Sequence, residues 1–354
     1  MTQWPQKFAA RLLLDGLAPR IDQRISASKM PFSAPEILRP EVNSRRWAST
    51  HYGVFVPELP APHRYLNTMT LIGATGSICF DNDYLCSSDA RRTATVLSST
   101  AAPGHRHYRA YDTHADCAFD EDGSALTWGD DLTLTANFPS FTVDAQYPQF
   151  AATLTITATH AASWFVRSMV CDHLSLLATC TGVIEDATGT TDIAGLCTVE
   201  YARYMSPQAL TSRPLPGALK LPLDFFTYQI VNLDETTQLL LTDVRAAGVT
   251  ACRLAHIRSL DGAATVYEDV TMSVTRYRGA PAIDELGRPM RVPEQIHWIV
   301  RENGRAVVEF TADVDSELRY GHGRGYAGAY SYTGAWLNRP IAGSGYLEWI
   351  DCES

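Results

Sequence analysis

The sequence predicts an all-β protein made of two similar antiparallel modules joined by a linker. Short stretches that alternate apolar and polar side chains with a period of two recur along the chain, and no long helical period appears. The pattern I-A-G, three residues, an aliphatic residue, Glu and an aromatic residue occurs at 193–201 and again at 341–349 (341 − 193 = 148 residues later). Residues 205–223 carry four prolines, which is typical of an inter-domain linker.

The domain organisation follows from length and from this repeat. A chain of 354 residues is longer than one hydrophobic core usually serves, so two domains are expected. We place an N-terminal arm at 1–45, the first β-module at 46–210 and the second at 218–354. Within the arm, residues 6–17 are expected to form a short helix. The two closing segments at 193–201 and 341–349 are interpreted as the last strands of two tandem copies of one unit.

The individual strands are predicted from alternation, β-branched content and turn residues. In the first module they are 51–56, 66–72, 132–136, 141–144 and 153–158, with a more continuously apolar run at 163–179. In the second they are 225–231, 238–245, 251–258, 271–277, 296–300 and 306–312. Asp261-Gly262 and Asn303-Gly304 are hairpin signals. Many short strands of even spacing predict barrels or sandwiches.

Composition restricts the class of partner. Hydrophobic residues make up 45% of the chain and charged residues 19%, as in a folded globular protein. A net charge of −10 argues against nucleic acid or an anionic membrane surface as a partner. No apolar run approaches the roughly 18–20 residues of a membrane span. The apolar block at 12–14 is too short for a secretory signal, and the eight cysteines lack C-x-x-C spacing, so a cytoplasmic protein with free thiols is expected. A homodimer is left open.

Two sequence patterns resemble a dinucleotide-binding motif and a metal site, but neither has the context that such a site needs. The segment 323–328 satisfies G-x-G-x-x-G, but a tyrosine-rich β stretch follows it instead of the helix that a dinucleotide site needs. His105 and His107 would share a strand face, with His114 nearby, yet arginines are interleaved and no further ligand falls in register. We therefore expect neither a metal nor a cofactor. Hydrolase-elbow, Walker-loop and H-E-x-x-H motifs do not occur.

A family resemblance enters at the C-terminal end. Residues 330–334 (Y-S-Y-T-G) and 343–348 (G-S-G-Y-L-E), with 291–298 upstream, resemble the closing part of the tandem lipocalin-like family. This family includes carotenoid hydratases, kievitone hydratase and fungal lipocalin-like Diels–Alderases. The resemblance implies two tandem lipocalin-like antiparallel barrels. Thr333 stands where several members carry a carboxylate, so a hydratase-type acid is missing there. Residues 51–64 also resemble the opening of a group of bacterial proteins.

Candidate acid–base groups are sought among polar residues that occur in only one copy. His51 and Tyr52 lie on the opening strand, where an imidazole and a phenol could act as acid and base. Glu200 and Glu348 occupy equivalent places in both copies, so we interpret them as structural. The turn 81–83 (D-N-D) is also interpreted as structural.

The expected ligand is a hydrophobic small molecule. His297 and Trp298 fall where the family pattern places a Trp, and Tyr326 and Tyr330 would share one face of a strand, so these four residues are the candidate ligand-binding residues. A barrel interior or an inter-barrel cleft would hold an isoprenoid, steroid or polyketide. The leading hypothesis is a cofactor-free enzyme of the hydratase, dehydratase, isomerase or cyclase type. A non-catalytic carrier is the second hypothesis, and a structural protein with filled barrels is the third.

Overall fold

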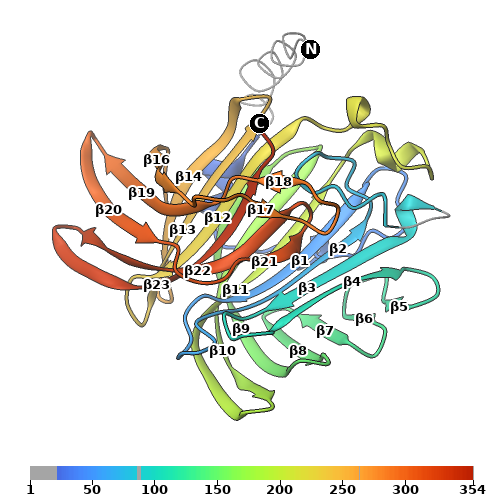
Figure 1. Cartoon of the computed structure of the whole chain (residues 1–354), viewed down its shortest axis with the longest axis horizontal. Helices are drawn as coiled ribbons and strands as arrows, with labels where there is room; N and C mark the ends of the chain where they lie inside the picture. Colours follow the sequence, from blue (N-terminus) through green and yellow to red (C-terminus); the bar gives the residue numbers. More distant parts are fainter. Residues whose placement is uncertain (1–21, 86–88, 263, 354) are drawn as a thin grey trace.

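Two β-sheets, each curled into a nearly closed barrel, make up almost the whole molecule (Figure 1). The computed structural model describes residues 22–85, 89–262 and 264–353. The first sheet has 11 strands and the second has 10, and they are coloured blue to green and yellow to red in Figure 1. The predicted helix at 6–17 lies outside the described residues. This architecture is that of two tandem lipocalin-like barrels, as expected from the sequence.

The first barrel follows a short arm. The arm contains α3 (Arg24–Ser28) and a 3₁₀ turn η2 (Pro35–Ile37). The strands of the first barrel are β1 (Ser49–Val56), β2 (Leu66–Gly73), β3 (Thr93–Ser99), β4 (Arg106–Asp112), β5 (Cys117–Phe119), β6 (Ala125–Trp128), β7 (Leu132–Asn137), β8 (Ser140–Gln146), β9 (Ala151–Arg167), β10 (Cys171–Asp186) and β11 (Gly189–Tyr204). A 3₁₀ turn, η3 (Ala90–Arg92), precedes β3. Strand order is β4-β3-β2-β1-β11-β10-β9-β8-β7-β6-β5.

The second barrel repeats this order after the 3₁₀ turns η4 (Pro207–Leu210) and η5 (Gly217–Leu219). Its strands are β12 (Leu223–Asn232), β13 (Thr237–Ala246), β14 (Val249–Ser259), β15 (Thr265–Tyr267), β16 (Asp269–Tyr277), β19 (Pro293–Glu302), β20 (Arg305–Asp313), β21 (Arg319–His322), β22 (Gly325–Trp336) and β23 (Arg339–Asp351). A separate small hairpin is formed by β17 (Ala282–Ile283) and β18 (Pro289–Met290). Strand order is β15-β14-β13-β12-β23-β22-β20-β19-β16, and β21 pairs with β22.

The repeated segments are the last strands of their sheets. β11 lies between β1 and β10, and β23 lies between β12 and β22, so each repeat copy joins the first strand of its sheet to the strand before it. The pairing is equivalent in both copies, since Gly182 pairs with Ile193 and Gly334 pairs with Ile341. A Cβ at either glycine would overlap a backbone carbonyl oxygen of the neighbouring strand. Close strand approach therefore explains why both copies carry glycine here.

Every strand predicted from alternation lies in or overlaps an observed strand. The two-residue turn at Asn303 and Gly304, both with positive φ, joins β19 to β20 as its sequence predicts. The apolar run at 163–179 is broken, because β9 ends at Arg167 and β10 begins at Cys171. The domain boundaries proposed from the sequence stay a prediction.

The barrels are filled with side chains and pack against each other. One apolar cluster fills the first barrel, and a second cluster fills the second barrel and continues into the face of the first through Phe55, Tyr65 and Phe165. Polar contacts cross the same interface, among them Asn67 Nδ2 to the Tyr346 hydroxyl at 3.1 Å. The cysteines that the structure describes carry free thiols. Within the described ranges, no helix has the length and apolarity that a membrane crossing requires.

Candidate active site between the barrels

A cavity of about 750 Å³ opens between the two barrels. Its wall is built by β1, β2, β9, β10 and β11 of the first barrel and by β12, β13, β14 and β21 of the second. The arm and the linker that contains η4 complete the wall. Most of the lining is apolar, and this volume lies within the range that small-molecule sites occupy.

Strand alternation on β1 decides which residues face this cavity. His51 points to the inter-barrel face and lines the cavity, whereas Tyr52 points into the first barrel, where it belongs to the core cluster. The Tyr52 hydroxyl donates to the Leu38 carbonyl of the arm at 3.0 Å. The structure therefore separates the predicted imidazole–phenol pair, because adjacent residues of a strand point to opposite faces.

Glu200 takes the place of that phenol beside His51. His51 on β1 and His173 on β10 flank Glu200, which lies on the strand between them. Glu200 Oε1 lies 3.4 Å from His51 Nε2 and 2.7 Å from His173 Nε2. His51 Nδ1 lies 2.8 Å from the Thr70 carbonyl oxygen and donates a hydrogen bond to it. One carboxylate oxygen is thus shared by two imidazoles at the cavity wall.

The other oxygen of Glu200 is buried and makes no hydrogen bond within the described part of the chain. The Glu200 side chain is 4% exposed, and its Oε2 has no partner among the described residues. A buried polar atom without a partner is costly, and such atoms often mark functional sites. Gly53 lies opposite Glu200 in the pairing, and a Cβ there would lie 2.6 Å from the Phe55 ring and 2.9 Å from His51 Nε2. The absence of a side chain at Gly53 leaves room for the imidazole.

Burial and charge act in opposite directions on these groups. Burial alone would lower the pKa of His51, but its contact with Glu200 and the charges of Glu200 and Glu348 raise it above its ordinary value. Burial alone would raise the pKa of Glu200, but His173 and His51 bring it well below its ordinary value. The result is an ionised carboxylate beside an imidazole that holds its proton to a higher pH than a free histidine.

The second barrel contributes an equivalent pair. His322 on β21 lines the cavity, and its Nε2 lies 3.1 Å from Glu348 Oε2 without a hydrogen bond between them. Glu348 Oε1 accepts a hydrogen bond of 3.0 Å from the Tyr346 hydroxyl. The rings of His51 and His322 are 6.3 Å apart. We call His51, His173, Glu200, His322 and Glu348 the His–Glu cluster.

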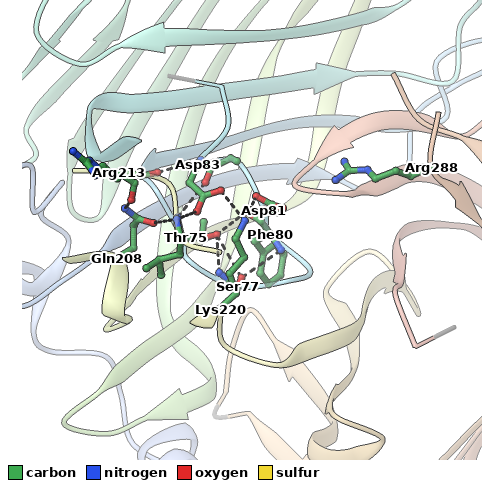
Figure 2. Close-up of polar contacts among 12 residues, drawn as sticks. Thr75, Ser77, Phe80, Asp81, Asp83, Gln208, Arg213, Lys220 and Arg288 are labelled. Carbon is green, nitrogen blue, oxygen red and sulfur yellow. Dashed lines mark hydrogen bonds and ion pairs between the residues drawn. The ribbon is translucent and has the colours of Figure 1, made fainter. Parts of the chain in front are cut away.

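The linker that covers one side of the cavity is held by a buried ammonium group. Lys220 Nζ donates to Asp81 Oδ1 and Asp83 Oδ1, both at 2.7 Å, and Figure 2 shows Lys220 between the two carboxylates. Asp83 also accepts from the backbone amide of Leu215 at 3.1 Å. Burial, followed by the Asp83 contact, raises the pKa of Asp81. The turn at 81–83 therefore anchors the linker against the first barrel.

The four predicted ligand-binding residues lie in the second barrel, away from this cavity. Trp298 and Tyr330 are fully buried in the core, and Trp298 Nε1 donates to Gln229 at 3.0 Å. Tyr326 is also a core residue. His297 is on the outer face, 3.3 Å from Glu309. A ligand role for these four residues stays a prediction.

Sequence reasoning does not select His173, His322 or the two glutamates. His173 and His322 carry no local motif. The interpretation of Glu200 and Glu348 as structural assumes that equivalent residues of a repeat occupy separate environments. In the structure the two closing strands take part in one interface, so equivalent positions converge on it. For Glu200 and Glu348, the repeat is itself the signal that could have identified them.

Comparison with known proteins adds the family and the fold. A family model described as "Family of unknown function (DUF6670)" matches residues 69–354. The chain belongs to this DUF6670 family. No relative was found among the curated proteins.

Solved structures of similar architecture include a candidate AttH from Nitrosomonas europaea, with 14% identity, a TM-score of 0.60, and coverage of 91% of this chain and 97% of that chain. CghA alone has 10% identity and a TM-score of 0.52, with coverage of 94% of this chain and 97% of that chain. CghA with Sch210972 has 10% identity and a TM-score of 0.51, with coverage of 93% of this chain and 97% of that chain. At these identities the similarity shows the fold alone.

Proposed function

We propose that this chain is an enzyme that transfers protons to and from a hydrophobic small molecule held between the barrels. The observation that carries this proposal is the placement of Glu200, with two imidazoles and an Oε2 that has no partner among the described residues, on the wall of a largely apolar cavity. Titratable groups with opposed pKa shifts in one cavity are typical of acid–base sites. The reaction class we favour is hydration or dehydration, or isomerisation or cyclisation.

The roles follow from the charges. His51 is the candidate general acid, because an imidazole with a raised pKa carries a transferable proton near neutral pH. Glu200 raises the pKa of His51 and, through its Oε1, holds the imidazoles of His51 and His173 in place beside the cavity. With its pKa depressed, Glu200 is a weak base, so the imidazoles are better suited to move the proton.

The mouth of the cavity supports a hydrophobic substrate. Val170, Met205 and Leu210 line it and are 46%, 39% and 84% exposed. Exposed apolar side chains around an opening favour the entry of an apolar molecule. CghA, which shares this fold, has been solved with Sch210972, so a ligand is compatible with the architecture. A carrier for a hydrophobic ligand is the second candidate function, favoured by the apolar lining.

The test combines binding and turnover. Native mass spectrometry of freshly purified protein would identify a co-purified ligand. Wild type, His51→Gln and Glu200→Gln would then be incubated in D₂O with a panel of terpenoid and steroid alcohols and alkenes, and products would be analysed for dehydration, isomerisation and deuterium content. We expect turnover in the wild type and a loss of about 10²–10⁴-fold in the variants.

A matched control is His114→Gln, which changes an exposed histidine of the first barrel that contacts Asn43 and does not line the cavity. It should leave turnover unchanged. Retained ligand binding without turnover in the wild type would favour the carrier. Equal turnover in wild type and His51→Gln would remove His51 from the proposal.

A further inference from the structure

A second group of histidines lies at the other end of the first barrel. His63 is in the loop after β1, His105 is just before β4, and Asp186 ends β10, far along that strand from His173. One ligand atom from each of these three residues lies within 4.8 Å of the other two. His105 Nε2 is 3.2 Å and His63 Nε2 is 4.0 Å from Asp186 Oδ2. Three loops that are distant in sequence therefore direct nitrogen and oxygen ligands to one point.

The orientation of both imidazoles is set by a single hydroxyl. Thr100 Oγ1 lies 3.3 Å from His63 Nδ1 and 3.2 Å from His105 Nδ1. Thr100 is fully buried, and this contact occupies the Nδ1 atoms and leaves both Nε2 atoms facing Asp186. Metal-binding histidines usually have such a hydrogen-bond partner on the nitrogen that does not bind the metal.

The carboxylate is fixed as well. Asp186 Oδ1 accepts hydrogen bonds from the Thr188 amide and hydroxyl, both at 2.6 Å, which leaves Oδ2 for the histidines. His105 also stacks on Phe150 with ring centroids 4.8 Å apart. The side chains of His63, His105 and Asp186 are only 2%, 8% and 6% exposed. The three groups are held in place before any ion binds.

We propose that His63, His105 and Asp186 form a binding site for a divalent transition-metal ion, Zn²⁺ in particular. Two imidazoles and one carboxylate suit Zn²⁺, whereas Mg²⁺ and Ca²⁺ prefer oxygen ligands only. Tetrahedral Zn²⁺ with bonds of about 2.0–2.1 Å places its ligand atoms about 3.3 Å apart. The His105–Asp186 distance of 3.2 Å matches this value, and the His63–Asp186 distance of 4.0 Å is longer, so His63 would move closer when the ion binds. Thr191 Oγ1 lies 3.2 Å from His63 Nε2, so its hydroxyl is close to the proposed site.

The ion would tie together the loop after β1, the loop before β4 and the β10–β11 hairpin. This site is separate from the His–Glu cluster, so it does not depend on the proposed reaction. The sequence does not indicate it, because the local pattern groups His105 with His107 and His114. In the structure His107 bonds the Tyr111 hydroxyl and His114 bonds Asn43.

The experiment uses the full chain, treated with EDTA and then freed of chelator. Zn²⁺ is titrated by calorimetry, and Co²⁺ binding is followed by visible absorption, which reports tetrahedral coordination. We expect one ion per chain and a melting temperature that rises with Zn²⁺ concentration. Thr100→Val, which removes only the hydroxyl that contacts both histidines, should weaken Zn²⁺ binding by about 10–100-fold. Each of the three ligand variants, His63→Gln, His105→Gln and Asp186→Asn, should weaken it more.

His114→Gln is the matched control, because it removes an exposed histidine of the same barrel and should bind Zn²⁺ like the wild type. Circular dichroism would confirm that each variant is folded. No stoichiometric binding to the wild type would overturn the proposal and leave a hydrogen-bonded His–Asp group. Binding that survives in the three ligand variants and disappears in His51→Gln would overturn it too, by placing the ion in the His–Glu cluster.

Discussion

Replacing Glu200 by Gln tests the electrostatics of the His–Glu cluster most directly. The substitution keeps the shape of the side chain and removes the charge that His51 and His173 share at 3.4 and 2.7 Å. Burial lowers the pKa of His51, and without the charge of Glu200 less would remain to raise it. We expect the pKa of His51 to move from above its ordinary value to below it.

The magnitude follows from the distances. Two unit charges 4 Å apart interact by about 4 kcal/mol at an effective dielectric constant of about 20. Leaving a buried charge without its partner costs about 3–5 kcal/mol. Because the His51 imidazole can release its proton once the carboxylate is gone, we expect a loss of about 2–3 kcal/mol in the free energy of unfolding near pH 6.

The pH dependence has a definite sign. The depressed pKa of Glu200 contributes stability above its unfolded value of 4.5, and this contribution is lost as pH falls through the folded pKa. The raised pKa of His51 contributes stability below its unfolded value of 6.5, lost as pH rises through the folded pKa. The difference in the free energy of unfolding between wild type and Glu200→Gln should therefore be largest between pH 4.5 and pH 6.5 and become smaller above pH 6.5.

The assay is imidazole ¹⁵N NMR across pH, with urea unfolding at each pH. Glu309→Gln is the matched control, since Glu309 forms a similar pair with His297 at 3.3 Å but is 50% exposed. An exposed pair contributes less than about 1 kcal/mol. If His51 titrates at the same pH in wild type and in Glu200→Gln, the electrostatic reasoning is refuted.

Three further changes test packing around the site. Gly53→Ala places a methyl group 2.6 Å from the Phe55 ring and 2.9 Å from His51 Nε2. Turnover should fall at least about 10-fold and stability by about 1–3 kcal/mol, measured by kinetics and urea unfolding. Gly182→Ala forces a Cβ into a backbone carbonyl of the next strand and should lower the free energy of unfolding by about 3 kcal/mol or more. Gly262→Ala is the control, because the space around Gly262 is open, and it should change the free energy of unfolding little. Equal effects of the two variants would contradict the close strand approach at Gly182. Lys220→Met leaves the buried Asp83 and the partly exposed Asp81 without their cation. It should cost about 2–4 kcal/mol at pH 7 and less at pH 4, where the carboxylates can protonate, as followed by melting curves at both pH values.

Local sequence patterns determined much of the fold. Alternation and β-rich composition located many of the barrel strands, and Asn303-Gly304 specified its hairpin, because these features depend only on near neighbours along the chain. The short strands β3 to β6, β15 and β21 were not predicted. The repeat at 193–201 and 341–349 identified the closing strand of each barrel. His51 was also selected from sequence, as a polar residue that occurs in only one of the two copies.

The partners of His51 were decided only by the tertiary structure. Tyr52 is its neighbour in sequence, but strand geometry turns Tyr52 to the opposite face. Glu200 and His173 lie 149 and 122 residues further along the chain (200 − 51 and 173 − 51), and they reach His51 through strand pairing. His322 and Glu348 arrive from the other barrel through domain packing. No local pattern records such contacts, because they are set by which sheet faces meet when the two barrels pack together.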